Sequence, residues 1–383
     1  MPWGLSQELS VSAAGLDQIR AIRQMGVNTV RTHLQFRDVM ATCTTVKPNA
    51  VADLQLLLRR LQETGLYVQL VGLSSWLGDD GDRAAQLSCY ADATEADRWT
   101  MQATFWRAVA SAVAGSSAVL GLDLMNEPMV PGPGAVESCW LPQAGNVCGP
   151  VPAGSATYSQ RIAKSLGTRS ATDVGKAWVK KMTDAIRPVD PTHNITLGCF
   201  AGMTCAGMSP AVQAATEIDY LSPHVYPKDC SKKGAGTLLT PPETDNDFID
   251  RCTFLGPFGG EAASEYNGTI VETDDSGNVV GTYDYHGSGD GLTYDLNQLS
   301  GWAAANLPVV VGETGTSSGG DLWRLIRTTM ASGATDGWIA IFVPDGQTLS
   351  QLRAPGGYAG GYYNGRLMQR VGREVAPCGN CGP

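Results

Sequence analysis

The sequence predicts an α/β protein, and three features of the chain favour a parallel sheet with helices packed around it. Short apolar runs alternate with segments whose apolar residues recur at helical spacing. No hairpin signal joins one of these runs to the next, which is typical of parallel strands. The connections that are too long for plain loops follow the C-terminal ends of strands, where barrel enzymes build their sites. We therefore expect a single (β/α)8 TIM barrel over residues 1–383.

The expected helices follow from periodicity and from end signals. Leu54, Leu57, Leu58 and Leu61 share one face of a helix that Gly65 is placed to end. A cap-like threonine and aspartate open the next helix, whose tryptophans recur at helical spacing and are interpreted as core. Helices are expected at 12–25, 53–65, 94–115, 173–187, 293–305 and 321–333.

The expected strands are short and mostly apolar, as buried parallel strands are. An eight-stranded barrel needs one strand more than the sequence provides, and that strand should precede the first helix. Only residues 1–10 are available there, so the first strand is expected to be short or missing. The remaining strands are expected at 27–31, 67–72, 120–125, 194–199, 218–223, 308–312 and 337–342.

Two long connections are expected to be insertions that shape the active-site end of the barrel. Counting the short first strand, residues 129–172 follow strand 4 and residues 228–292 follow strand 6. Within the second insertion, residues 269–285 predict a β-hairpin that turns at 275–278.

Composition narrows the classes of partner and compartment. The chain is 43% hydrophobic with a formal net charge of −10, which suits a large core and disfavours nucleic acid or an anionic membrane as partner. We find no membrane-spanning apolar run and no visible signal peptide, and we expect a monomer. Ten cysteines in neighbouring pairs favour disulfides and a secreted protein, with scattered buried thiols as the alternative. The pairs are Cys43–Cys89, Cys139–Cys148, Cys199–Cys205, Cys230–Cys252 and Cys378–Cys381.

Two glutamates directly follow apolar strands. Glu127 stands in "LGLDLMNEP" and Glu313 in "VVVGETG". Either one alone could be a loop carboxylate held by backbone amides. Because the C-terminal ends of parallel barrel strands meet at one face, the two are expected to converge on one site. Paired carboxylates in such a site are the chemistry of glycosidic bond hydrolysis.

These residues carry a resemblance to a known family. "DLMNEP" and "VVVGETG" resemble the acid/base and nucleophile strands of clan A glycoside hydrolases, most closely family 5, the cellulase and mannanase family. Arg31 in "GVNTVRTHL" is similar to that family's arginine at the end of strand 2, and His224 and Tyr226 in "SPHVYP" are similar to its strand-6 His-x-Tyr. The resemblance spans residues 12–345.

The resemblance implies a retaining mechanism with named roles. Glu313 would be the nucleophile, kept ionised by Arg31 and Tyr226, and Glu127 would be the proton donor that later acts as base. Asn126 would bind the sugar 2-hydroxyl. His224 would orient Glu127 or the sugar, with a satisfied core histidine as the alternative. Strand alternation places His33 on the same side as Arg31, where it would line the site.

Two departures from the family pattern concern the sugar subsite. The strand-3 segment "LVGLSSW" carries Ser74 and Ser75 where many members have a histidine. The strand-8 tryptophan could be Trp338, but Phe342 lies nearer the end of the strand. Sugars also stack on aromatic rings. Of five aromatic residues, each taken alone is more often structural, but one or two are expected to be sugar platforms. These are Trp76, Trp140, Tyr283, Tyr285 and Trp338.

The sequence therefore predicts a retaining β-glycoside hydrolase that acts within a β-1,4-linked glucan or mannan, with a carbohydrate as its partner. No cofactor or metal is expected, because the four histidines form no H-E-x-x-H and no Walker lysine follows the glycine-rich "GSGDG". The alternatives are an exo-acting or glycolipid-directed member of the same family and a carbohydrate-binding barrel without activity. A metal-dependent barrel hydrolase is a third.

Overall fold

The protein is described here from a computed structural model. A search of the described helices finds none with the length and apolarity needed to cross a membrane. The structure describes residues 13–24, 28–74, 87–131, 140, 160–200, 205–225, 268–273, 279–285, 299–314 and 329–339.

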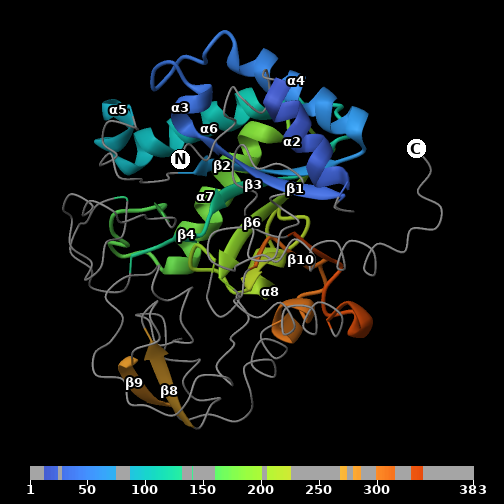
Figure 1. The fold of residues 1–383 in the computed structure, drawn as a ribbon. Coiled ribbons are helices and arrows are strands. Elements are labelled where there is room, and N and C mark those ends of the chain that lie inside the picture. The colour runs from blue at the N-terminus through green and yellow to red at the C-terminus, as the bar shows by residue number, and fades with distance from the viewer. Residues whose placement is uncertain are drawn as a thin grey trace.

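A six-stranded parallel sheet forms the centre of the molecule (Figure 1). All its neighbouring strands pair in parallel, as predicted, and they follow one another in chain order. In sheet order they are β1 (Thr29–Gln35), β2 (Tyr67–Ser74), β3 (Val119–Asn126), β6 (Asn194–Phe200), β7 (Ser222–Val225) and β11 (Glu313–Thr314). β10 (Val310–Val311) pairs in parallel with β12 (Gly337–Trp338) and continues the same order.

The strand boundaries differ from the prediction most clearly at β1 and β7. β1 runs four residues further than expected, to Gln35, because its register with β2 continues to Ser74 after an irregularity. β7 begins at Ser222, although Leu221 already bridges to Val309. The last expected strand is described only through β12 and Ile339, and residues 1–12, where the first strand was expected, lie outside the described residues.

The sheet curls on itself. β1 and β11 are its two outermost strands, yet Arg31 Nη1 of β1 lies 3.2 Å from Glu313 Oε2 of β11. Deeper inside, Gln69 Nε2 of β2 donates to Ser222 Oγ of β7 over 3.3 Å. Side chains from distant strands can meet in this way only if one face of the sheet encloses them. The described residues thus form a curled parallel half-barrel.

Helices cover the outer face of the sheet, close to where periodicity placed them. Thr94 and Ser170 cap two of them, each accepting a hydrogen bond from a backbone N–H three residues on. Gly65 ends a third in the left-handed region, with φ of 72°. The longer helices are α2 (Ala13–Gln24), α4 (Ala50–Thr64), α6 (Glu95–Val113) and α7 (Ala171–Ile186). The shorter ones are α3 (Phe36–Val39), α5 (Ser88–Ala91) and α8 (Pro210–Ala214).

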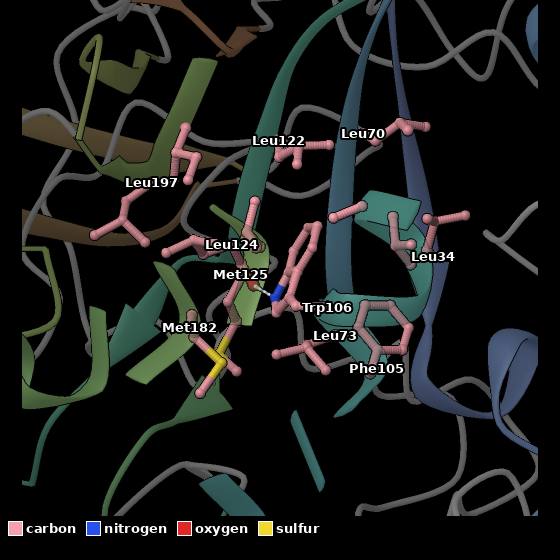
Figure 2. Packing of buried hydrophobic residues seen from close by; sticks show 14 of the residues in the cluster. Leu34, Leu70, Leu73, Phe105, Trp106, Leu122, Leu124, Met125, Met182 and Leu197 are labelled. Atoms are coloured by element: carbon pink, nitrogen blue, oxygen red, sulfur yellow. Dashed lines mark hydrogen bonds between the residues drawn. The ribbon is translucent and has the colours of Figure 1, made fainter. Parts of the chain in front are cut away.

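The main core lies between the outer face of the sheet and these helices. Figure 2 shows Trp106 of α6 among Leu73, Leu124 and Met125 from the strands, with its indole N–H donating to the Leu124 carbonyl over 3.2 Å. Trp106 and Trp178 are fully buried. The prediction that the tryptophans of the helix at 94–115 belong to the core is therefore confirmed for Trp106, while Trp99 is partly buried and packs against the core.

Two of the predicted disulfides lie in described residues, and both are formed. Cys43 is bonded to Cys89 with a Cα–Cα distance of 6.2 Å, and Cys199 to Cys205 with 5.5 Å. Both separations are ordinary for a disulfide. The other three predicted pairs lie outside the described residues.

The two expected insertions are described only in part. β4 (Pro128–Met129) and β5 (Gln160–Arg161) pair in parallel at the edges of the first. In the second, β8 (Gly268–Thr273) and β9 (Val279–Tyr285) form the predicted antiparallel hairpin, which lies away from the central sheet (Figure 1).

Candidate active site

The C-terminal ends of β3, β7 and β11 bring the predicted site residues together. Asn126 is the last residue of β3 and Glu127 follows it directly. His224 of β7 is in register with Glu313 of β11, so their side chains start from neighbouring backbone positions. Arg31 of β1 reaches the group across the interior. These five residues, far apart in sequence, meet in one buried cluster.

The two carboxylates are buried and close. Glu127 is 5% exposed and Glu313 7% exposed. His224 Nδ1 lies 2.8 Å from Glu127 Oε1 and 3.1 Å from Glu313 Oε2, so this one nitrogen faces both acids. The nearest donor atoms of the three residues all lie within 4.8 Å of one another. A carboxylate pair at this spacing suits direct attack by one carboxylate better than insertion of a water between them.

Glu127 has an unusual backbone. Its φ is +46°, in the left-handed region that residues with a side chain rarely adopt. Such a conformation costs on the order of 1 kcal/mol or more and persists where the surroundings impose it. Its N–H donates to the Gly198 carbonyl of β6 over 2.8 Å, and Pro128 follows it. The turn redirects the chain as it leaves β3.

Arg31 links the cluster. Its Nη1 lies 3.2 Å from Glu313 Oε2 and donates to His33 Nε2 over 3.1 Å. Its Nη2 donates to Asp123 Oδ2 over 2.8 Å and to Asn126 Oδ1 over 3.0 Å. Burial alone would lower the pKa of Arg31, but the charges of Asp123 and Glu313 outweigh it and raise that pKa. The guanidinium is therefore a fixed positive charge beside Glu313.

His224 of the cluster and His33, which contacts Arg31, are both held neutral. Burial lowers the pKa of His224 to about 4, with Arg31 adding to the effect and Glu313 opposing it. Burial, followed by the Arg31 charge, also lowers the pKa of His33 well below its ordinary value. A neutral His224 has one N–H to offer at Nδ1, and the two carboxylates that surround this nitrogen favour the proton there.

A second layer of polar groups, not predicted from the sequence, holds the Arg31 guanidinium on the side away from Glu313. Asp123, fully buried, accepts from Arg31, from Gln69 Nε2 over 3.1 Å and from the Gly198 N–H over 2.9 Å. Gln69 also contacts Ser222 and accepts from the Tyr220 hydroxyl over 3.0 Å. The available signal was an aspartate in the middle of an otherwise apolar strand, since an unpaired buried charge is costly.

The remaining predicted residues are not all in the cluster. Trp338 is half-buried at β12, packs against Val225 and Val311, and donates its indole N–H to Thr335 over 2.9 Å. Trp140 is buried beneath Arg98, whose guanidinium carbon lies 4.4 Å from the ring centroid, so it packs as a core residue. Trp76, Ser75, Tyr226 and Phe342 lie outside the described residues, as do the side chains of Ser74, Tyr283 and Tyr285.

Within the described part of the chain, Glu127, His224 and Glu313 are also the group whose donors could hold a small cation. Oxygen and imidazole ligands of this kind suit zinc. Arg31 already places a positive charge 3.2 Å from Glu313, which opposes a second cation at the same oxygen.

The family model for cellulases, glycosyl hydrolase family 5, matches residues 12–343. The match covers most of the 383 residues, including every residue of the buried cluster. The chain belongs to glycoside hydrolase family 5. The family is one of retaining glycoside hydrolases in clan A, so the predicted resemblance is confirmed and the chain is an enzyme of that family. A search of curated proteins finds no match.

Solved structures of family 5 enzymes are similar in fold. Exo-β-1,4-mannosidase Op5Man5 from Opitutaceae bacterium strain TAV5 has a TM-score of 0.58 at 15% identity, and the match covers 97% of this chain but only 58% of that one. The endo-1,4-β-mannanase of Rhizomucor miehei has a TM-score of 0.52 at 14% identity, covering 95% and 93%. The endo-β-1,4-glucanase Xac0029 from Xanthomonas axonopodis pv. citri has 0.51 at 14%, covering 94% and 90%.

At these identities the likeness concerns the fold alone. It implies the TIM barrel of family 5 for the chain as a whole, of which the described residues show the curled parallel half-barrel. The exo-mannosidase is considerably longer than this chain, which spans about three fifths of it.

Proposed function

We propose that this family 5 enzyme hydrolyses β-glycosidic bonds by double displacement, with Glu313 as nucleophile and Glu127 as acid and then base. The observation that carries the proposal is the carboxylate pair, whose nearest oxygens lie within 4.8 Å. Retaining enzymes place their carboxyl groups about 5–5.5 Å apart, whereas inverting enzymes leave about 6.5–9.5 Å for a water. The spacing supports retention.

The surroundings of the two acids support the assignment of roles. A nucleophile must be ionised, and Glu313 has the fixed charge of Arg31 at 3.2 Å. A proton donor must hold its proton in a low-dielectric site beside another anion, and Glu127 is buried with Glu313 close by. The reverse assignment would place the general acid 3.2 Å from the positive charge of Arg31.

The reaction has two chemical steps. An oxygen of Glu313 attacks the anomeric carbon while the bond to the leaving oxygen breaks and Glu127 gives that oxygen its proton. Glu127, now a carboxylate, takes a proton from water, and the water oxygen displaces Glu313 from the sugar. Asn126, whose amide oxygen is fixed by Arg31, would donate its N–H to the sugar 2-hydroxyl.

The substrate class we propose is a β-1,4-linked glucan or mannan cleaved within the chain. The names of the similar structures include an endo-mannanase and an endo-glucanase, which support this class. Exo action is the second candidate, because the exo-mannosidase Op5Man5 has the highest TM-score of these three. The two formed disulfides support an oxidising, extracellular place of action, and we propose a monomer.

One experiment tests the reaction and the mode of attack together. Purified enzyme is screened on carboxymethyl cellulose, β-mannan, xyloglucan and aryl β-glycosides, and proton NMR follows the anomer that forms first. We expect the β anomer first and a rapid drop in polymer viscosity. The α anomer as first product would contradict retention, and release of single sugars without loss of viscosity would favour exo action.

A further inference from the structure

The backbone on both sides of Glu127 is held by two hydrogen bonds. The Glu127 N–H donates to the Gly198 carbonyl over 2.8 Å. The carbonyl of the following residue, Pro128, accepts from the Ala206 N–H, also over 2.8 Å. Between these two bonds lies the left-handed Glu127, with φ of +46°. Because residues with a side chain avoid this conformation, the two bonds are what impose it.

A disulfide joins the two partners of these bonds. Gly198 precedes Cys199 in β6, and Ala206 follows Cys205 in a tight turn at 205–208. Cys199 and Cys205 are bonded to each other with Cα atoms 5.5 Å apart, and both are buried. The covalent bond therefore fixes the distance between the strand that holds the Glu127 N–H and the turn that holds the Pro128 carbonyl.

The turn at 205–208 is fixed on its far side as well. The Thr172 hydroxyl of α7 donates to the Gly207 carbonyl over 2.9 Å. Gly175 of α7 approaches so closely that a Cβ there would lie 2.2 Å from the Ala206 carbonyl oxygen. The turn is thus clamped between α7 and the disulfide, and movement of Cys205 away from β6 would be transmitted to Pro128.

We propose that the Cys199–Cys205 disulfide is a positioning element for the acid/base carboxylate Glu127. The inference rests on the acid/base role proposed above for Glu127. The disulfide touches no substrate; it acts through the Gly198 and Ala206 hydrogen bonds, which aim the Glu127 side chain at the leaving oxygen. Loss of the disulfide would therefore weaken proton transfer more than attack by Glu313.

Leaving-group dependence separates this role from a general contribution to folding. A phenyl glycoside needs protonation as it leaves, whereas a 2,4-dinitrophenyl glycoside does not. The test compares kcat/KM of the wild type and of Cys199→Ser/Cys205→Ser on both aryl glycosides. The sugar part is cellobiose or mannobiose, whichever the wild type hydrolyses. We expect the phenyl substrate to lose about 10- to 100-fold and the dinitrophenyl substrate about twofold at most.

The chain provides a matched control in its other described disulfide. Cys43→Ser/Cys89→Ser removes a disulfide of the same kind that lies outside the 198–208 region, so both substrates should keep their wild-type ratio. If the Cys199→Ser/Cys205→Ser protein does not fold by circular dichroism, Thr172→Val loosens the same turn more gently. We expect that variant to show the same selectivity at smaller amplitude.

Glu127→Ala distinguishes failure of this inference from failure of the proposed function. If Glu127→Ala is selective for the phenyl substrate but the 199–205 variants lose both substrates equally or neither, the positioning role is wrong. If Glu127→Ala itself shows no selectivity, the acid/base assignment is wrong and the inference falls with it.

Discussion

Arg31 is shared between two carboxylates, and this sharing determines how much of its charge acts on Glu313. One guanidinium nitrogen contacts Asp123 at 2.8 Å and the other contacts Glu313 at 3.2 Å. The shorter contact belongs to Asp123, which is fully buried and also accepts from Gln69 and the Gly198 N–H. Asp123 thus holds the guanidinium in place and balances part of its charge.

Replacing Asp123 by Asn should therefore reduce catalysis without removing a catalytic group. Asn keeps the shape but not the charge, so the guanidinium is drawn toward Glu313 and the nucleophile is pulled from its position. We expect kcat/KM on an aryl glycoside to fall about 10- to 100-fold. Asp219→Asn is the control, since it weakens the Asp219–Arg187 pair and the bond from the Ile195 N–H, both outside the site. A similar loss in the control would contradict this account.

His224 should make the folded state sensitive to acid. Its pKa is about 4 in the folded protein against an ordinary 6.5, so the unfolded chain takes up a proton first as the pH falls through 6.5. Stability is then lost down to pH 4 and not further. This single group accounts for roughly 2 kcal/mol between about pH 7 and about pH 4.5. Urea unfolding of His224→Gln should show an acid-induced loss smaller by that amount; an unchanged loss would contradict the neutral, buried histidine.

At the scale of the element, β6 contributes Gly198, which has no side chain, next to the polar groups of the site. A Cβ on Gly198 would lie 2.5 Å from His224 Nε2 and 2.7 Å from both Arg31 Nη2 and Asp123 Oδ2. Because Gly198 has no side chain, polar groups from β1, β3 and β7 can occupy the space next to it. Gly301, by contrast, is exposed in a helical segment, and a Cβ there would meet no atom within 4 Å.

Gly198→Ala should therefore reduce kcat/KM by at least about 100-fold, because the three polar groups must move apart. Gly301→Ala should keep full activity and raise the free energy of unfolding by about 0.5–1 kcal/mol, since alanine is the better helix former. Steady-state kinetics and urea unfolding check both. Full activity in Gly198→Ala would show that the cluster is looser than its distances indicate.

Sequence periodicity was sufficient to predict most of the described helices and strands and to predict that the ionisable residues converge. Apolar runs located the described strands to within a few residues, and Asn126, Glu127, His224 and Glu313 lie at or next to the C-terminal ends of parallel strands. Arg31 reaches them from within β1. Periodicity could not show the network of Asp123, Gln69, Tyr220 and Ser222, because partners inside a curled sheet depend on which strands face each other. The left-handed Glu127 was equally hidden, since its tertiary hydrogen bonds impose it.

At the scale of the whole molecule, the two described disulfides should separate stability from activity. Cys43–Cys89 spans 46 residues and Cys199–Cys205 spans 6. Loop-closure entropy predicts losses of about 4 and about 2 kcal/mol on their removal. Removal of Cys43–Cys89 should thus lower the free energy of unfolding in urea more, and removal of Cys199–Cys205 should lower turnover more. The reverse order of stabilities would contradict the entropic explanation.

The most direct test of the account is the nucleophile itself. Glu313→Ala should lose at least about 10⁴-fold in kcat/KM on a dinitrophenyl β-glycoside, while the exposed Glu217→Ala stays at the wild-type value. Added azide should restore part of the Glu313→Ala activity and yield the α-glycosyl azide, because azide then attacks from the face that the carboxylate has left. Hydrolysis by Glu313→Ala at the wild-type rate, or a β-glycosyl azide as product, would contradict double displacement through Glu313.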